Sequence, residues 1–265
     1  MRSGGDDDMD YKKEVQNQFG SHAENYLYSS IHKLGKDLKK MLEITNFTDQ
    51  DSLLDIATGA GHTANAYAPY VKEVTALDLT EQMLKVAKDF IESNGYENVR
   101  FVQGDAENLP FPNESFNIIT CRIAPHHFPN IKAFISEVYR VLIPGGQFIL
   151  NDNVAPERDE FDQFYNTVEK TRDHSHFRAW KKTEWMIMLE EQGFHIYECH
   201  RFEKVFHFEN WCKRMSLSEN EMNNLSDYMK NSDDQIKHKF KILENEHGIQ
   251  SFSGEAIVLK AKKVR

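Results

Sequence analysis

The stretch Leu53–Ala64, with the sequence LLDIATGAGHTA, decides the fold of this chain. An apolar run ends close to the carboxylate of Asp55. A turn of small residues that includes Gly59 and Gly61 follows, and a helix-forming segment comes next. This order is typical of a strand that leads into a ligand-binding loop of an α/β sheet. A side chain at either glycine would hold a ligand away from the backbone.

The next strand-like run, Glu73–Asp78, ends in a second acid. Asp78 follows the loop at a spacing close to the roughly 20 residues at which an acid binds the two hydroxyls of a ribose. The glycine loop and Asp78 together therefore predict a cofactor that carries a nucleoside.

Two cofactor classes remain open at this point. The pattern Gly59-x-Gly61-x-x-Ala64 also fits the dinucleotide fingerprint, so an NAD-dependent oxidoreductase stays as an alternative. Asp55 directly before the loop counts against a pyrophosphate, because like charges repel. S-adenosylmethionine (SAM) carries an ammonium and a sulfonium, and it tolerates an acid there.

Five blocks of sequence follow one another in register: residues 55–61, 78–84, 104–111, 116–122 and 140–146. Together they resemble the class I SAM-dependent methyltransferases, and within that class the branch of the ubiquinone/menaquinone biosynthesis C-methyltransferases. The resemblance runs from about Phe19 to Phe194. Two positions depart from the family pattern, because Ala57 replaces the first loop glycine and Asn117 replaces a common Asp.

The resemblance implies cofactor-binding roles along the chain. Asp78 accepts both ribose hydroxyls, Asp105 and Ala106 meet the adenine, and Tyr26, from a Phe19-x-x-x-Ala23-x-x-Tyr26 pattern, closes over the methionine end. The full set of expected cofactor-binding residues is Tyr26, Asp55, Ala57, Gly59, Gly61, Asp78, Leu79, Met83, Asp105, Ala106, Cys121 and Arg122. Plain structural roles compete with several of these, such as a loop-fixing role for Asp55 and a tight turn at the glycines.

Histidines follow the expected fourth strand, where the methyl acceptor is expected to lie. His126 is the candidate general base, because an imidazole titrates near neutral pH. A structural hydrogen-bonding role for the pair His126-His127 competes with it. The run His174–Arg178 and Asp152 are weaker candidates for contacts with the acceptor. No metal-ligand spacing is visible, so no metal is expected.

The expected fold is α/β, with a Rossmann-like seven-stranded sheet that is mostly parallel with one antiparallel strand, helices on both faces and a helical cap. Residues 1–10 are expected to be a disordered tail and residues 11–265 a single methyltransferase domain. Within it, residues 11–44 form N-terminal helices and residues 45–155 the SAM-binding core, while 156–192 and 207–248 are helical cap inserts. The remaining strands complete the sheet.

Composition excludes several classes of protein. A formal net charge of −10 argues against a general nucleic-acid binder. Three cysteines without metal or redox spacing suit a reducing cytoplasm, and neither a transmembrane run nor a signal peptide is visible. A homodimer is left open.

The prediction from sequence is therefore an enzyme that moves a methyl group from SAM to a small acceptor. Aromatic residues in the inserts favour an apolar or aromatic acceptor. A non-catalytic SAM-binding protein is the main alternative, and an NAD-dependent oxidoreductase is the weaker one.

Overall fold

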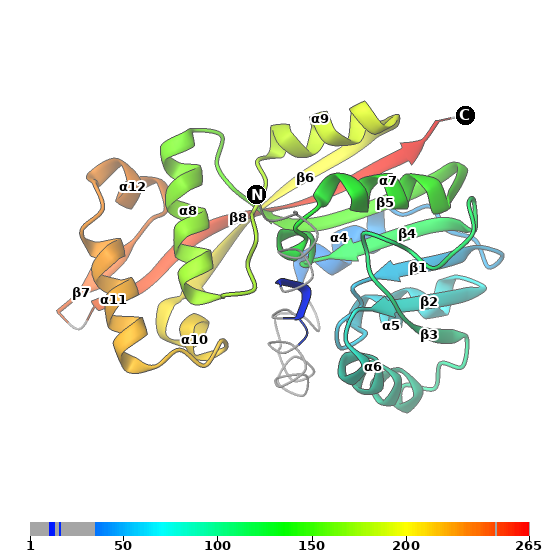
Figure 1. The fold of residues 1–265 in the computed structure, drawn as a ribbon, viewed down its shortest axis with the longest axis horizontal. Coiled ribbons are helices and arrows are strands. Elements are labelled where there is room, and N and C mark those ends of the chain that lie inside the picture. Colours follow the sequence, from blue (N-terminus) through cyan, green and yellow to red (C-terminus); the bar gives the residue numbers. More distant parts are fainter. Residues whose placement is uncertain (1–10, 14–15, 17–34, 247, 265) are drawn as a thin grey trace, which may run out of the picture.

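A single mixed sheet organises the chain. The computed structural model describes residues 11–13, 16, 35–246 and 248–264. The strand order is β3-β2-β1-β4-β5-β8-β6, with β7 paired to β8 (Figure 1). The strands are β1 (Ser52–Ile56), β2 (Glu73–Asp78), β3 (Val99–Gln103), β4 (Phe116–Arg122), β5 (Leu142–Val154), β6 (Phe194–His207), β7 (Leu243–Asn245) and β8 (Gly248–Lys263).

The strand directions match the expected class. Strands β1 to β5 pair in parallel, and β8 is antiparallel to its three partners, β5, β6 and β7. The expected mostly parallel sheet with one antiparallel strand is thus confirmed, and the strand count is eight rather than seven. The short strand β7, inside a segment expected to be helical, is an addition that the sequence did not indicate.

Strand β5 includes the turn-forming residues Pro144, Gly145 and Gly146. Leu142 already pairs with Phe116, and the register shifts before Gln147 pairs with Ile118. The turn residues therefore form an irregularity within the strand.

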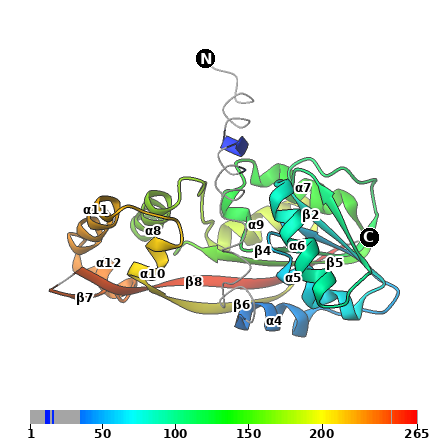
Figure 2. The same ribbon diagram turned by 90° about the horizontal axis from the view of Figure 1, so that it is seen from below.

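Helices cover both faces of the sheet (Figure 2). Apolar residues of α7 and α9 pack on one face, and those of α4, α5 and α6 pack on the other. The core helices are α4 (Lys36–Ile44), α5 (His62–Tyr67), α6 (Glu81–Ser93), α7 (Ile131–Val141) and α9 (Lys182–Gln192), with 3-10 turns η1 (Ala68–Tyr70) and η2 (Pro125–His127).

Local sequence signals set several helix ends. The Asn130 side chain accepts a hydrogen bond from the Ala133 N–H and so caps α7, as its position predicts. Gly193 ends α9 with a left-handed φ of 102°. Thr80 occupies the N-cap position of α6 but makes no side-chain cap there. Its own N–H bonds to Asp78 instead.

A helical cap stands beyond the core sheet. Strands β6 and β8 run on beneath α8 (Asp159–Arg172), α10 (Phe208–Lys213), α11 (Glu219–Lys230) and α12 (Asp234–Lys239) (Figure 1). Phe161, Phe164, Tyr165 and Trp211 are buried there together with Phe252 of β8. These rings hold the cap onto the strands. Within the described ranges, no helix combines the length and the apolar character that crossing a bilayer requires.

Candidate active site

A cleft opens where the loops after β1, β2, β3 and β4 meet, with about 1090 Å³ of space that no atom fills. Ligands bind at this edge of open α/β sheets. Its walls are formed by residues 57–60, 62–63, 77–80, 83, 104–107, 122–124 and 127–129, together with Lys12.

The loop after β1 is held in a left-handed backbone conformation. Ala57, Gly59 and Gly61 have φ values of 54°, 55° and 83°. A Cβ added at Gly59 would meet no atom within 4 Å, whereas one at Gly61 would lie 2.9 Å from Ile91 Cδ1 and 3.0 Å from Ala87 Cβ. Gly59 therefore leaves room in the cleft. Gly61 lies behind the cleft and lets the loop pack against α6, so its contribution is to packing.

Asp78 hydrogen-bonds both to the loop after β1 and to the residue that precedes α6. Its Oδ2 accepts the Gly59 N–H at 2.9 Å, and its Oδ1 accepts the Thr80 N–H at 2.9 Å. The residue is 7% exposed. Burial raises the pKa of its carboxyl, although the hydrogen bonds from Thr80 and Gly59 oppose this shift. The Thr80 side chain and the Leu79 N–H also hydrogen-bond to this carboxylate.

Asp55 lies beneath the loop, outside the lining of the cleft. Thr58 Oγ1 and Thr120 Oγ1 each donate to one of its oxygens at 2.7 Å. Burial raises the pKa of the Asp55 carboxyl to about 6. These contacts agree with the alternative in which Asp55 fixes the loop. They do not indicate a direct contact between Asp55 and a ligand.

Residues after β3 form the far wall of the cleft. Asp105 and Ala106 line it as expected, but Lys12 Nζ lies 2.6 Å from Asp105 Oδ2 and 2.5 Å from Glu107 Oε2. The Glu107 N–H donates to Asp105 Oδ1 at 2.9 Å. Both Asp105 oxygens thus already have partners. No sequence pattern indicates Lys12, whereas Glu107 belongs to the 104–111 block.

The remaining expected residues divide between the cleft and the core. Leu79, Met83 and Arg122 line the cleft. The Arg122 guanidinium also pairs with Asp37 of α4 at 2.8 Å. Cys121 is fully buried in the core, and burial raises the pKa of its thiol. Phe19, Ala23 and Tyr26 lie outside the described residues.

The two histidines of η2 differ in their environments. His126 Nδ1 lies 2.6 Å from Asp152 Oδ1. Burial lowers the pKa of His126, but the charge and hydrogen bond of Asp152 outweigh it, and the net shift is upward. His127 lines the cleft, and its Nδ1 lies 2.6 Å from the Ser175 carbonyl oxygen. Burial and the neighbouring His126 lower the pKa of His127 to about 4.

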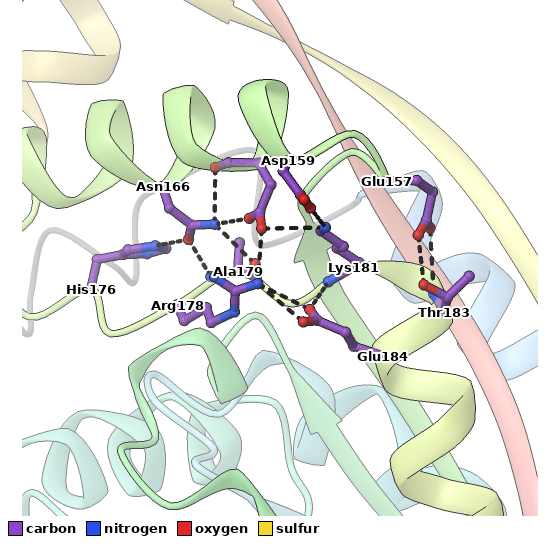
Figure 3. A network of polar contacts seen from close by, with 10 residues as sticks. Glu157, Asp159, Asn166, His176, Arg178, Ala179, Lys181, Thr183 and Glu184 are labelled. Carbon is purple, nitrogen blue, oxygen red and sulfur yellow. Dashed lines mark hydrogen bonds and ion pairs between the residues drawn. The ribbon is translucent and has the colours of Figure 1, made fainter.

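The His174–Arg178 run serves mainly to join α8 to α9 (Figure 3). Arg178 donates to Asp162 at 2.9 Å and to Glu184 at 3.1 Å. His176 Nε2 bonds to Asn166 Oδ1 at 2.9 Å. These partners account for Arg178 and His176 as structural residues, which was the alternative to an acceptor contact.

Among the described residues, no group of three or more His, Cys, Asp or Glu side chains is placed to hold a metal ion.

Known proteins are similar to this chain in sequence and in fold. A family model described as a methyltransferase domain matches residues 54–150. The chain is 36% identical over 246 residues to the uncharacterized methyltransferase YcgJ of Bacillus subtilis, covering 92% of this chain and 97% of that one. It is 31% identical over 173 residues to the ubiquinone/menaquinone biosynthesis C-methyltransferase UbiE of Rickettsia akari, covering 59% of this chain and 68% of UbiE.

Solved structures agree with these relatives. The crystal structure of BH2331 from Bacillus halodurans superimposes with a TM-score of 0.86 and 54% identity, covering 87% of this chain and all of that one. The YcgJ structure superimposes with a TM-score of 0.84 at 36% identity, covering 86% of this chain and 98% of YcgJ. The chain belongs to the class I SAM-dependent methyltransferase family.

Proposed function

We propose that this chain binds SAM in the cleft and transfers its methyl group to a small-molecule acceptor. The observation that carries this proposal is the Asp78 carboxylate, which lines the cleft between the Gly59 loop and the start of α6. A carboxylate at this place can accept charge-assisted hydrogen bonds from the hydroxyls of a ribose. The absence of a side chain at Gly59 leaves the space that a cofactor in contact with the backbone needs.

The residues that line the cleft are assigned to the parts of SAM as follows. Asp78 is assigned the ribose hydroxyls, and Asp105 with Ala106 the adenine. Leu79 and Met83 offer apolar contact on the same wall. Other residues have supporting roles: Ala57 and Arg122 line the methionine end, Tyr26 is expected to cover it, and Asp55, Gly61 and Cys121 hold the loop and the strand from behind.

SAM, when bound, supplies an electrophilic methyl group on its sulfonium. The protein then has to position the acceptor, exclude water and take up a proton. His126 is assigned the last task. Asp152 holds its Nδ1–H, so the neutral ring presents the lone pair of Nε2, and the raised pKa suits a base near neutral pH.

The aromatic residues of the inserts do not support an apolar acceptor. Phe161, Phe164, Tyr165 and Trp211 are buried in the cap. Rings that pack against one another give no indication of a ligand.

Titration calorimetry with SAM, S-adenosylhomocysteine and NAD tests the cofactor. We expect the first two to bind and NAD not to bind. Asp78→Ala should weaken SAM binding, since each charge-assisted hydrogen bond contributes about 1.5–3 kcal/mol. It should also lower the stability of the fold, because the Gly59 and Thr80 N–H groups lose their acceptor. Asp89→Ala, an exposed site on α6, is the control. Binding of NAD without SAM would contradict the proposal.

A further inference from the structure

A buried group of polar side chains lies between the end of β5 and helix α8. It consists of His126, Asp152, Tyr165, Glu169 and Arg172, and we call it the polar chamber. Asp152 and Glu169 both act electrostatically on His126 and on Tyr165, so the two carboxylates lie close to these groups. Neither the cofactor contacts nor the packing of the cap accounts for this concentration of charge.

Each carboxylate of the chamber has one oxygen engaged and one left over. Asp152 Oδ1 is held by His126, and Glu169 Oε2 by Arg172 at 3.2 Å. Among the described residues, Asp152 Oδ2 and Glu169 Oε1 have no hydrogen-bond partner, although Asp152 is 0% exposed and Glu169 is 4% exposed. Two donors of the chamber are also without a partner in the described part of the chain, Arg172 Nε and the hydroxyl of Tyr165, which lies beside Glu169. A buried carboxylate oxygen without a donor is costly, and native proteins seldom retain one without a function.

The chamber adjoins the cofactor cleft. The rings of His126 and His127 lie with their centroids 4.2 Å apart, and His127 lines the cleft. A molecule that contacts Asp152 therefore lies next to the end of the cleft at which β4 and η2 meet. This is the side from which a methyl acceptor has to approach.

The spare oxygens decide what kind of molecule fits. Both are acceptors, so a bound group has to donate a hydrogen bond to satisfy them, whereas the Tyr165 hydroxyl and Arg172 Nε can donate to an acceptor of the same molecule. An amine or a hydroxyl donates to the two carboxylate oxygens, and a phosphate or a quinone carbonyl does not. A long apolar chain would leave both oxygens buried without a partner.

We propose that the polar chamber is the acceptor site and that it takes a small polar molecule through an amino or hydroxyl group, which Asp152 and Glu169 hold by hydrogen bonds. This rests on the proposed function. The bound N–H or O–H gives its proton to His126 Nε2. Its electron pair forms the new bond to the methyl carbon, whose bond to sulfur breaks with the pair left on sulfur.

The first experiment identifies the acceptor class. Wild-type protein with SAM is offered ethanolamine, catechol or a prenylated naphthoquinol, and release of S-adenosylhomocysteine is measured. Thermal shift with S-adenosylhomocysteine present reports binding without turnover. We expect ethanolamine or catechol to raise the melting temperature and to be methylated, and the prenylated quinol to do neither.

The second experiment tests the chamber itself. Glu169→Gln keeps an oxygen for Arg172 and removes the charge. It should raise the KM for the acceptor about 10- to 100-fold, as expected for the loss of a hydrogen bond to a charged group. SAM affinity should be unchanged, and the melting temperature unchanged or higher, because binding-site charges often cost stability. Asp159→Asn, on the same helix with a side chain 97% exposed, is the matched control.

Three outcomes overturn the proposal. The first is methylation of the prenylated quinol while the polar compounds neither bind nor react. The second is SAM binding without any response to either polar compound. The third is a Glu169→Gln variant that matches Asp159→Asn in KM and loses several degrees of melting temperature, which assigns the chamber to the fold. Failure to bind SAM at all is a separate result, because it rejects the proposed function itself.

Discussion

Replacing either glycine of the loop by alanine should separate binding from folding. Gly59 and Gly61 both have left-handed φ values, 55° and 83°, so an alanine at either costs about 1–2 kcal/mol of backbone strain. Alanine also restricts the unfolded chain, which offsets about 0.4–1 kcal/mol of this cost. The two sites differ in what the new methyl group meets. At Gly61 it meets Ile91 and Ala87 at 2.9 and 3.0 Å, and at Gly59 it meets nothing within 4 Å.

The expected magnitudes follow from these contacts. Overpacking adds about 1–3 kcal/mol, so Gly61→Ala should lose about 2–4 kcal/mol of unfolding free energy. Gly59→Ala should lose about 1 kcal/mol. For a chain of this size, these losses lower the melting temperature by roughly 5–15 °C and 2–4 °C. The methyl group at Gly59 stands in the cleft, and it should raise the Kd for SAM by about tenfold or more, equivalent to about 1.4 kcal/mol.

Urea unfolding followed by tryptophan fluorescence measures stability, and titration calorimetry measures SAM affinity. Both measurements are made on the wild type and on the two variants. Equal losses of stability in both variants would refute the packing argument for Gly61. Unchanged SAM affinity in Gly59→Ala would refute the assignment of its backbone to the cofactor.

Other changes test further features of the site. Ala57→Gly should raise the melting temperature by roughly 1–4 °C, because it removes left-handed strain at a φ of 54°. Burial raises the pKa of Asp55 from 3.8 to about 6, so the folded state binds the proton more tightly than the unfolded state does. The wild-type free energy of unfolding should therefore fall by about 2–3 kcal/mol relative to that of Asp55→Asn as the pH rises from about 4 to about 6. Urea titrations at each pH measure this difference. Once an acceptor is identified, the wild-type rate should rise with pH as a group with a pKa above 6.5 loses its proton. His126→Ala should remove this inflection and lower kcat about 10²–10⁴-fold. Lys12→Met should lower the Kd for SAM about two- to fivefold in calorimetry, because a partly exposed ion pair of at most about 1 kcal/mol no longer competes for Asp105.

Much of the cleft wall was predictable because its signals are short motifs. The small-residue loop acts within a few residues of its own position, and the acid at the end of β2, Asp78, reaches back 19 positions to the Gly59 N–H. Alternation of strands and helices then fixes the parallel sheet, since right-handed crossovers leave few other arrangements.

Other features depend on contacts between distant segments. Gly59 and Gly61 look alike in sequence, and only the position of α6 assigns Gly61 to packing. Lys12 reaches Asp105 across 93 positions of the chain, which no pattern indicates. The aromatic rings of the inserts suggested a ligand, but their burial against β8 shows that they form the core of the cap.

The sequence by itself determined the family, the sheet and many of the residues that line the cleft, because each of these depends on short motifs and on periodicity. Only the tertiary structure decided which charged groups meet between β5 and α8. Asp152 and Glu169 lie on different elements, and each is an ordinary acid in its own segment. Burying both beside His126 is what leaves two carboxylate oxygens without donors. That arrangement depends on how α8 packs against β5, and local sequence does not encode it.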